Sequence, residues 1–171
     1  YIRQNYEFDD ENLEIIDGGT LGFKLMAYFQ EYDNVIILDT VSIEDTAGSI
    51  YRLPSEVLLG LGNYRKTAHE VEIVEMLEIV SVLDSHANVT IMGIIPEDII
   101  SVEIGLTKKM EEKFEEYILN IIKEIESLGI KSKKINNIAI KDIVKNIIGS
   151  YNGEHLNRIP NEEDFTHAIN I

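Results

Sequence analysis

The chain has 171 residues, of which 44% are hydrophobic and 27% charged, a composition typical of one globular domain that needs no disulfide or metal to hold its core. The absence of cysteine excludes disulfides and thiolate chemistry and fits a reducing cytoplasm, where we expect the protein to act. The formal net charge of -16 argues against nucleic acid or a membrane surface as partner, and no apolar run approaches the roughly 20 residues of a membrane span.

The first third of the chain consists of short apolar segments separated by turns. These segments predict, in chain order, the end of a helix at residues 1–6, a short strand at 13–16 and a helix at 21–32. Residues 35–38 are four consecutive apolar residues, three of them β-branched, a run typical of a strand covered on both faces in a parallel sheet. Another strand is expected at residues 49–53, ending at the proline that follows.

Longer elements follow in the second half. The apolar spacing of residues 70–83 predicts an amphipathic helix, and residues 89–95 predict a third buried strand, stopped by a proline. A long helix is expected over residues 106–128, because Thr107 is suited to cap its start and Gly129 to end it.

The alternation of strands and helices predicts a three-layer α/β sandwich, in which helices flank a mostly parallel twisted sheet. The composition changes after residue 130, where a basic run and two asparagines precede a possible helix at residues 138–148. We therefore divide the chain into a main domain at residues 1–130 and a C-terminal helix with a flexible tail at residues 131–171.

Two candidate metal-binding or catalytic side chains lie at or near the expected carboxyl ends of strands, where functional groups gather in open α/β sheets. Asp39 directly follows an apolar strand, so its carboxylate can bind a metal, act as a base or simply accept hydrogen bonds from loop amides. His69 lies in the first turn of a helix and is either a ligand suited to nickel or zinc or an ordinary surface histidine. For each residue alone, the structural role is the simpler interpretation.

A third candidate is the turn Asp17-Gly18-Gly19-Thr20 between a strand and a helix. Paired glycines permit positive φ and the close approach of another backbone, whereas the simpler interpretation is a tight turn in which Thr20 caps the next helix. The sequence contains no serine nucleophile elbow, no phosphate-binding loop and no His-Glu-x-x-His motif.

Five short segments together resemble the hydrogenase maturation endopeptidases, in order and at matching separations, over about residues 1–130. They are Asp-Gly-Gly-Thr at residues 17–20, an apolar strand ending in Asp at 35–39, Thr-x-His-x before a helix at 67–70, a strand followed by Pro-Glu at 91–97 and Gly-Leu-Thr at 105–107. The resemblance implies a phosphorylase/hydrolase-like fold and an endopeptidase that removes the C-terminal peptide of a [NiFe]-hydrogenase large-subunit precursor after nickel insertion.

The resemblance also implies roles for the candidate residues. Asp39 and His69 match two metal-coordinating, catalytic positions, and the metal is nickel already bound to the precursor. Gly18, Gly19 and Thr20, with Asp17 before them, match the turn linked to substrate recognition. Such enzymes are sometimes classed as aspartic-type peptidases.

The sequence departs from the family pattern at its start. The family opens with an apolar strand, a Gly-x-Gly-Asn turn and an acidic loop whose Glu is the third metal ligand, and the sequence contains none of these. We therefore expect a sheet that lacks the usual first strand, with an unfilled position that invites pairing with another chain. The alternative function is a truncated, non-catalytic α/β module that recognises the precursor without cleaving it.

Overall fold

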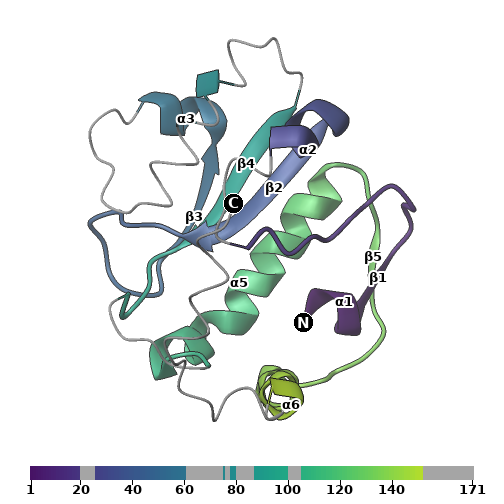
Figure 1. Cartoon of the computed structure of the whole chain (residues 1–171), viewed down its shortest axis with the longest axis vertical. Helices are drawn as coiled ribbons and strands as arrows, with labels where there is room; N and C mark the ends of the chain where they lie inside the picture. The colour runs from purple at the N-terminus through teal and green to yellow at the C-terminus, as the bar shows by residue number, and fades with distance from the viewer. Residues whose placement is uncertain (20–25, 61–74, 76–77, 80–86, 100–104, 152–171) are drawn as a thin grey trace, which may run out of the picture.

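The computed structural model describes residues 1–19, 26–60, 75, 78–79, 87–99 and 105–151. Helices and strands mix along the chain, as expected for an α/β protein (Figure 1). The elements are α1 (Ile2–Asn5), β1 (Tyr6–Phe8), α2 (Met26–Glu31), β2 (Asn34–Thr40), β3 (Ile50–Pro54), α3 (Ser55–Gly60), β4 (Asn88–Ile94), α5 (Lys108–Ser127), β5 (Ser132–Lys134) and α6 (Ile140–Tyr151). None of the described helices is long and apolar enough to cross a membrane.

The larger sheet has the strand order β2-β4-β3 and is mixed. β2 runs parallel to β4, with Asp39 opposite Gly93, whereas β3 runs antiparallel to β4. The prediction of a mostly parallel sheet is therefore wrong for the described strands. The reason is the short loop at residues 41–49, because a parallel return needs a crossover of about a dozen residues or more. Both Thr40 and Ile50 pair with Ile94, so β3 begins at the end of the sheet where β2 stops.

The strand predicted at residues 49–53 is present as β3, but it includes Pro54 instead of ending before it. Pro54 pairs with Thr90 in the register of the sheet. Proline is tolerated here because β3 lies at the edge of the described sheet, where one side of the strand makes no ladder hydrogen bonds. The chain then enters α3, which the sequence analysis did not predict.

β4 and β2 differ in burial. In β4 every residue after Asn88 is buried, as predicted for residues 89–95. The prediction that residues 35–38 are covered on both faces is wrong, because β2 is only half-buried and Leu38 is 46% exposed. The difference follows from position: β4 lies between two strands, while β2 has a neighbour on one side only among the described strands.

Two hydrophobic clusters hold the described elements together. On one side of the sheet Phe29 of α2 packs with Val35 and Ile37 of β2, together with buried residues of β3 and β4. On the other side the apolar stripe of α5 packs against Met92 and Ile36. Burial of each large aliphatic side chain contributes about 1.5–3 kcal/mol, so these clusters are the main source of stability. In Figure 1, α5 runs along β2 and β4, which its apolar stripe contacts.

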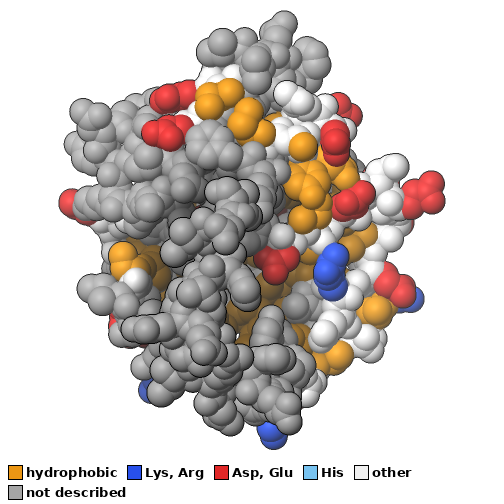
Figure 2. Space-filling view, in the orientation of Figure 1, with side chains coloured by type: hydrophobic (Ala, Val, Ile, Leu, Met, Phe, Trp, Pro, Cys, Tyr) orange, Lys and Arg blue, Asp and Glu red, His pale blue; other side chains and the backbone are white. Residues whose placement is uncertain are grey.

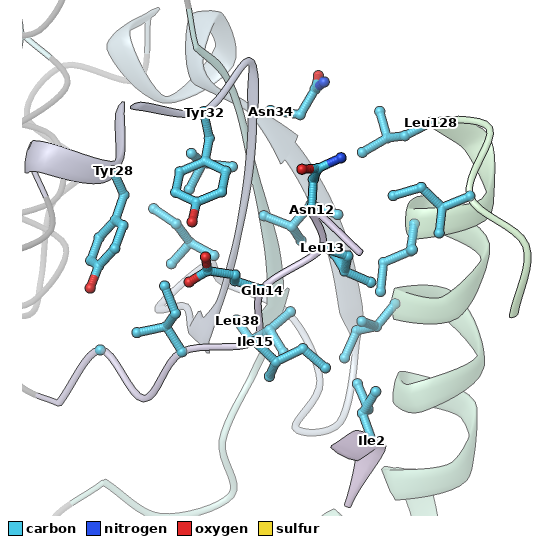
Figure 3. Close-up of a pocket in the computed structure, with 18 of the residues that line it drawn as sticks. Ile2, Asn12, Leu13, Glu14, Ile15, Tyr28, Tyr32, Asn34, Leu38 and Leu128 are labelled. Carbon is cyan, nitrogen blue, oxygen red and sulfur yellow. The ribbon is translucent and has the colours of Figure 1, made fainter. Parts of the chain in front are cut away.

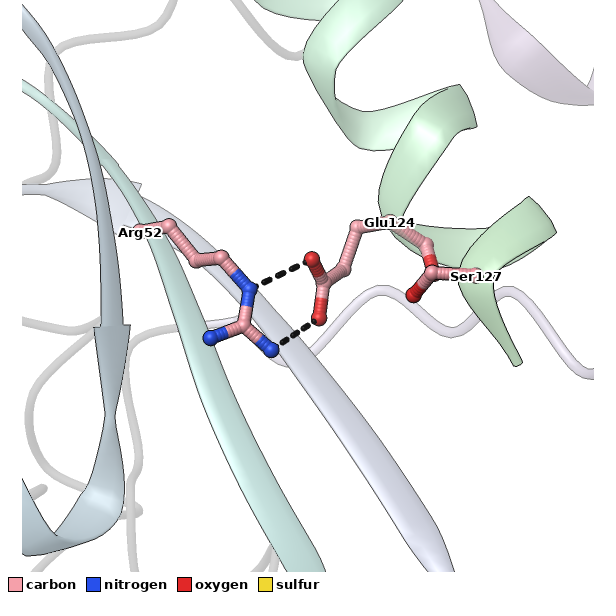
Figure 4. A network of polar contacts seen from close by, with 3 residues as sticks. All are labelled: Arg52, Glu124 and Ser127. Atoms are coloured by element: carbon pink, nitrogen blue, oxygen red, sulfur yellow. Dashed lines mark hydrogen bonds and ion pairs between the residues drawn. The ribbon is translucent and has the colours of Figure 1, made fainter.

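An ion pair joins the edge strand β3 to α5 (Figure 4). The Nε atom of Arg52 lies 2.6 Å from Oε2 of Glu124, and its Nη2 atom lies 2.8 Å from Oε1. The Glu124 side chain is 9% exposed and that of Arg52 is 52% exposed. The carboxylate is thus buried against the sheet and receives both hydrogen bonds of a two-point guanidinium contact.

The bounds of α5 agree with the sequence signals. The hydroxyl of Thr107 accepts a hydrogen bond from the backbone N–H of Met110, so Thr107 is the predicted cap. Gly129 has φ +92°, a left-handed conformation that favours glycine and ends the helix as predicted. Helix α2 covers part of the predicted residues 21–32, and residues 20–25 lie outside the described residues. Of the helix predicted at residues 70–83, the described residues Glu75, Glu78 and Ile79 are helical.

The strand predicted at residues 13–16 is absent; these residues are described and form no strand. Leu13 and Ile15 instead pack on the cluster below α5. The N-terminal strand is β1, which pairs antiparallel with β5. Apolar residues at every second position fit a strand. A strand also needs a neighbouring backbone to pair with, and the sequence pattern does not show whether one is present.

The N-terminal segment also holds the chain after residue 130. The side chain of Asn5 is fully buried; its Nδ2 donates to the carbonyl of Ile138, and its Oδ1 accepts from the backbone N–H of Ile138. The predicted last helix is present as α6, which begins two residues later than expected and continues through Gly149 to Tyr151. The remainder of the predicted tail lies outside the described residues, and the division at residue 130 stays a prediction.

Candidate functional site

A groove runs along the side of β2 that pairs with no described strand (Figure 3). Its volume is about 620 Å³, and one wall is residues 34–39 of β2 while the other is the extended segment 12–19. Side chains of α5 and the residues after it complete the lining, with Ile2 near one end and Leu128 near the other. A volume of this size lies within the range of roughly 300–1,000 Å³ that is usual for ligand sites.

Asp39 lies on the β2 wall of this groove and is half-buried. Its Oδ1 accepts a hydrogen bond of 2.7 Å from the backbone N–H of Thr40. This contact is the structural role that the sequence left open for a strand-end aspartate. A carboxylate has two oxygens, so one backbone contact is compatible with a second role in the groove.

The predicted turn at residues 17–19 lines the same groove. The backbone N–H of Gly19 donates to Oδ1 of Asp17 at 3.0 Å, which closes the turn. Gly19 has φ +60°, and no atom lies within 4 Å of the position that a Cβ would take. Glycine at this position is therefore explained by backbone conformation, and not by close approach of another chain segment. Thr20 lies outside the described residues.

The structure thus brings two of the three predicted features, Asp39 and the Asp17–Gly19 turn, to one groove. His69 lies outside the described residues, as do the other histidines of the chain. In the described part of the chain, no three His, Cys, Asp or Glu side chains are grouped as a metal site would require. The convergence of Asp39 and His69 on one metal therefore stays a prediction.

Glu14 and Tyr32 form a polar contact across the groove that the sequence analysis did not identify. Their hydrogen bond, followed by desolvation and the negative charge of Glu14, raises the pKa of Tyr32 to about 12. Figure 3 shows the Tyr32 hydroxyl directed toward Glu14, with Tyr28 beside it. No local motif joins two residues so far apart in sequence. The only sequence signal is the spacing of Tyr28 and Tyr32 by four, which places both on one helix face.

Comparison with known proteins decides the family. The sequence model of the hydrogenase maturation proteases matches residues 1–124. The chain belongs to this family. Among curated relatives of this hydrogenase maturation protease, protein HydD of Wolinella succinogenes is 32% identical over 146 residues, which cover 81% of this chain and 92% of HydD. The hydrogenase 2 maturation protease of Escherichia coli is 26% identical over 133 residues, which cover 77% of this chain and 80% of that protein.

A solved structure agrees with the sequence comparison. The hydrogenase maturating endopeptidase HybD of Escherichia coli superimposes with a TM-score of 0.71 and 25% sequence identity, and the match covers 78% of this chain and 83% of HybD. The family resemblance and the α/β class predicted from the sequence are therefore confirmed, and the protein is a maturation endopeptidase, hence a hydrolase.

The protease is also closely packed at the end of β4, beside Asp39. Gly93 lies opposite Asp39, and a Cβ at position 93 would lie 2.6 Å from Cγ1 of Val41. From α5, the Tyr117 hydroxyl donates to the carbonyl of Met92. Burial, and to a smaller extent the charge of Asp39, raises the pKa of Tyr117. These contacts fix the end of β4 and, through the sheet register, the place of Asp39.

Proposed function

We propose that this protease removes the C-terminal peptide of a [NiFe]-hydrogenase large-subunit precursor after nickel has been inserted, and that it does so in the cytoplasm. The proposal is supported by membership of the maturation protease family. The structural observation that carries it is that Asp39 and the Asp17–Gly19 turn line the same groove. A peptide chain entering this groove meets a carboxylate on one wall and backbone amides of a glycine turn on the other.

In this proposal the nickel belongs to the substrate. Asp39 and His69 bind it, because carboxylate oxygen and imidazole nitrogen are both suitable ligands for nickel, and a Glu completes the set as the family resemblance implies. Gly18, Gly19 and Thr20, with Asp17, contact the precursor. Hydrolysis adds water to the scissile carbonyl and breaks the C–N bond, with a proton passing to the leaving amine. An aspartic-type class and a three-layer sandwich are further parts of the proposal.

The function is tested by incubating the protease with nickel-loaded precursor and following the precursor mass. We expect a single loss of mass at the precursor's C-terminus. Asp39→Ala and His69→Ala are expected to abolish this loss. Glu75→Ala is the control, because Glu75 is an exposed helical residue outside the lining of the groove. An unchanged precursor mass with the wild-type protease would overturn the function, and full activity of both site variants would overturn the assigned roles.

A further inference from the structure

Tyr117 of α5 reaches the backbone of the sheet close to Asp39. Its hydroxyl donates to the carbonyl of Met92 in β4, and its ring packs on the hydrophobic cluster between α5 and the sheet. Apolar contacts have no preferred direction, so they tolerate small displacements of the helix along the strands. A hydrogen bond to one carbonyl depends on distance and angle, so it fixes the helix and the strand in one relative position.

The carbonyl of Met92 faces the backbone of Asp39. β2 and β4 form a parallel ladder that includes Asp39, and at its end the backbone N–H of Val41 donates to the carbonyl of Ile94 at 3.1 Å. Hydrogen-bonding groups that face one neighbour recur at every second residue of a strand. Two residues earlier on both strands, the carbonyl of Met92 is therefore the one that faces the backbone N–H of Asp39. Tyr117 thus contacts the acceptor group against which Asp39 is aligned.

The opposite face of β4 is closed at the same level of the sheet. A Cβ at position 93 would lie 2.6 and 2.8 Å from the two methyl carbons of Val41. Val41 belongs to the hydrophobic cluster on the α2 side of the sheet, whereas Met92 belongs to the cluster on the α5 side. The end of β4 is therefore held between Val41 on one face and Tyr117 on the other.

Electrostatics keeps the Tyr117 hydroxyl in the form that can donate. Burial, followed by the negative charge of Asp39, raises the pKa of Tyr117. The phenol is therefore neutral across the physiological pH range and keeps the proton that it shares with the carbonyl of Met92. The influence of Asp39 also means that its carboxylate and the phenol lie within electrostatic reach of each other.

A second polar contact of the same helix provides a comparison. Glu124 lies about two turns after Tyr117 on α5 and binds Arg52 of β3. In the strand order β2-β4-β3, this contact is separated from Asp39 by β4. Helix α5 thus makes one polar contact beside Asp39 and one on the far side of the sheet, so their effects on cleavage can be compared.

We propose that Tyr117 is a positioning residue of the cleavage reaction: by holding the carbonyl of Met92, its hydroxyl fixes the place of the Asp39 carboxylate relative to the precursor. The proposal rests on the proposed function, because it takes Asp39 as a residue that acts on the precursor. Tyr117 acts through the sheet and not by touching the precursor. Such indirect effects are large, since a displacement of about 1 Å at a reacting group costs on the order of a hundredfold in rate.

The proposal is tested by removing only the hydroxyl. For Tyr117→Phe we expect kcat for cleavage of nickel-loaded precursor to fall by about tenfold or more, with KM changed by less than about threefold because the precursor keeps its other contacts. Para-aminophenylalanine at position 117 keeps the ring and carries an N–H donor, so it is expected to recover most of the lost kcat. In amide NMR spectra, the Asp39 resonance is expected to shift in Tyr117→Phe and to return toward its original position with para-aminophenylalanine.

Two controls separate positioning from a general loss of stability. Arg52→Met breaks the other polar contact of α5 and is expected to leave kcat within about twofold of the wild type, although it destabilises the fold. Tyr51→Phe is the same substitution in β3, where the hydroxyl donates to the exposed carboxylate of Asp45 and not to a backbone carbonyl of β4. It is expected to behave like Arg52→Met in kcat. All rates are compared at a temperature at which circular dichroism shows each variant folded.

The outcomes separate this inference from the proposed function. If Asp39→Ala abolishes cleavage while Tyr117→Phe retains the wild-type kcat, or loses no more than Arg52→Met, the inference is wrong and the function stands. An unmoved Asp39 resonance, or no recovery with para-aminophenylalanine, also overturns the inference. If the wild-type protease leaves the precursor uncut, or Asp39→Ala cleaves at the full rate, the proposed function or the role of Asp39 fails, and the inference fails with it.

Discussion

Arg52 and Glu124 form a two-point ion pair in which one partner is buried and the other is half in solvent. Both guanidinium-to-carboxylate distances are below 3 Å, at 2.6 and 2.8 Å. The carboxylate of Glu124 lies on the face of α5 that covers the sheet, so it has little access to water that could replace the guanidinium. The main contribution of the pair to stability is therefore that it supplies hydrogen bonds to the buried carboxylate of Glu124, and not the attraction between charges at the surface.

Removal of the guanidinium is expected to destabilise the protein. Arg52→Met leaves the Glu124 carboxylate buried without its partner, and we expect the free energy of unfolding in urea to fall by about 2 kcal/mol, less than for a fully buried pair because Arg52 is half exposed. The double variant Arg52→Met/Glu124→Met is expected to recover most of the loss. Lys113→Met is the control, since its pair with Glu116 is exposed and contributes at most about 0.5 kcal/mol. An equal loss of stability in Arg52→Met and Lys113→Met would contradict this account.

A methyl group at position 93 is expected to disturb the sheet beneath the proposed site. The added Cβ of Gly93→Ala would lie 2.6 and 2.8 Å from the two methyl groups of Val41, so one of the residues has to move. We expect a loss of about 1–3 kcal/mol in thermal unfolding, together with lower cleavage activity because Asp39 lies opposite. Val41→Ala in the same chain removes both methyl groups and is expected to restore part of the stability. Absence of rescue would show that the contact with Val41 is not the cause.

The phenol of Tyr32 is expected to lose its proton at a higher pH than an ordinary tyrosine. Its pKa is raised from 10.0 to about 12 by the hydrogen bond with Glu14, so the neutral phenol persists across the physiological range. Because the folded pKa is raised, the stability that this contact contributes is present below pH 10 and is lost as the pH rises through about 12. The difference in absorbance at 295 nm between the wild type and Tyr32→Phe gives the titration directly. Glu14→Gln is expected to move this titration toward pH 10, and an unmoved curve would exclude Glu14 as the cause.

Asn5 is expected to hold the chain after residue 130 in place. Asn5→Ala removes both side-chain contacts to the backbone of Ile138 and leaves those groups without their partner, which costs about 1–3 kcal/mol. Hydrogen exchange of the amides in residues 132–143 is expected to accelerate. Asn12→Ala is the matched control, because its amide bonds only to the nearby Asp10 on the surface. Exchange that increases equally in both variants would mean that Asn5 has no special role.

The elements that were predicted with nearly correct bounds carry their signals within a single segment. β4 is a mainly apolar segment that Pro96 follows closely, and α5 has an apolar stripe, a threonine cap and a final glycine. β2 was correctly predicted as a strand. Its degree of burial was not predicted correctly, because a run of apolar residues does not reveal which elements cover it. The prediction for residues 13–16 failed for a related reason: their apolar pattern fits a strand, but they pair with no described strand.

The candidate site was predictable only in part. Asp39 and the Asp17–Gly19 turn were selected because each lies at an expected strand end, and the structure places both in one groove lining. Glu14 and Tyr32 were not selected, since their contact depends on where the extended segment 12–19 lies relative to α2 and β2. The roles of Asp39 and His69 in nickel binding stay predictions.

The pairing of β1 with β5 has a practical meaning for anyone who shortens the gene. The family match ends at residue 124, and a truncation soon after it looks harmless by sequence comparison. Yet Tyr6–Phe8 would then lose its neighbouring strand, and Asn5 would keep a buried amide with no Ile138 to receive it. Residues 132–138 thus hold the N-terminal segment in place, and a protein cut at residue 130 is expected to unfold locally at its N-terminus.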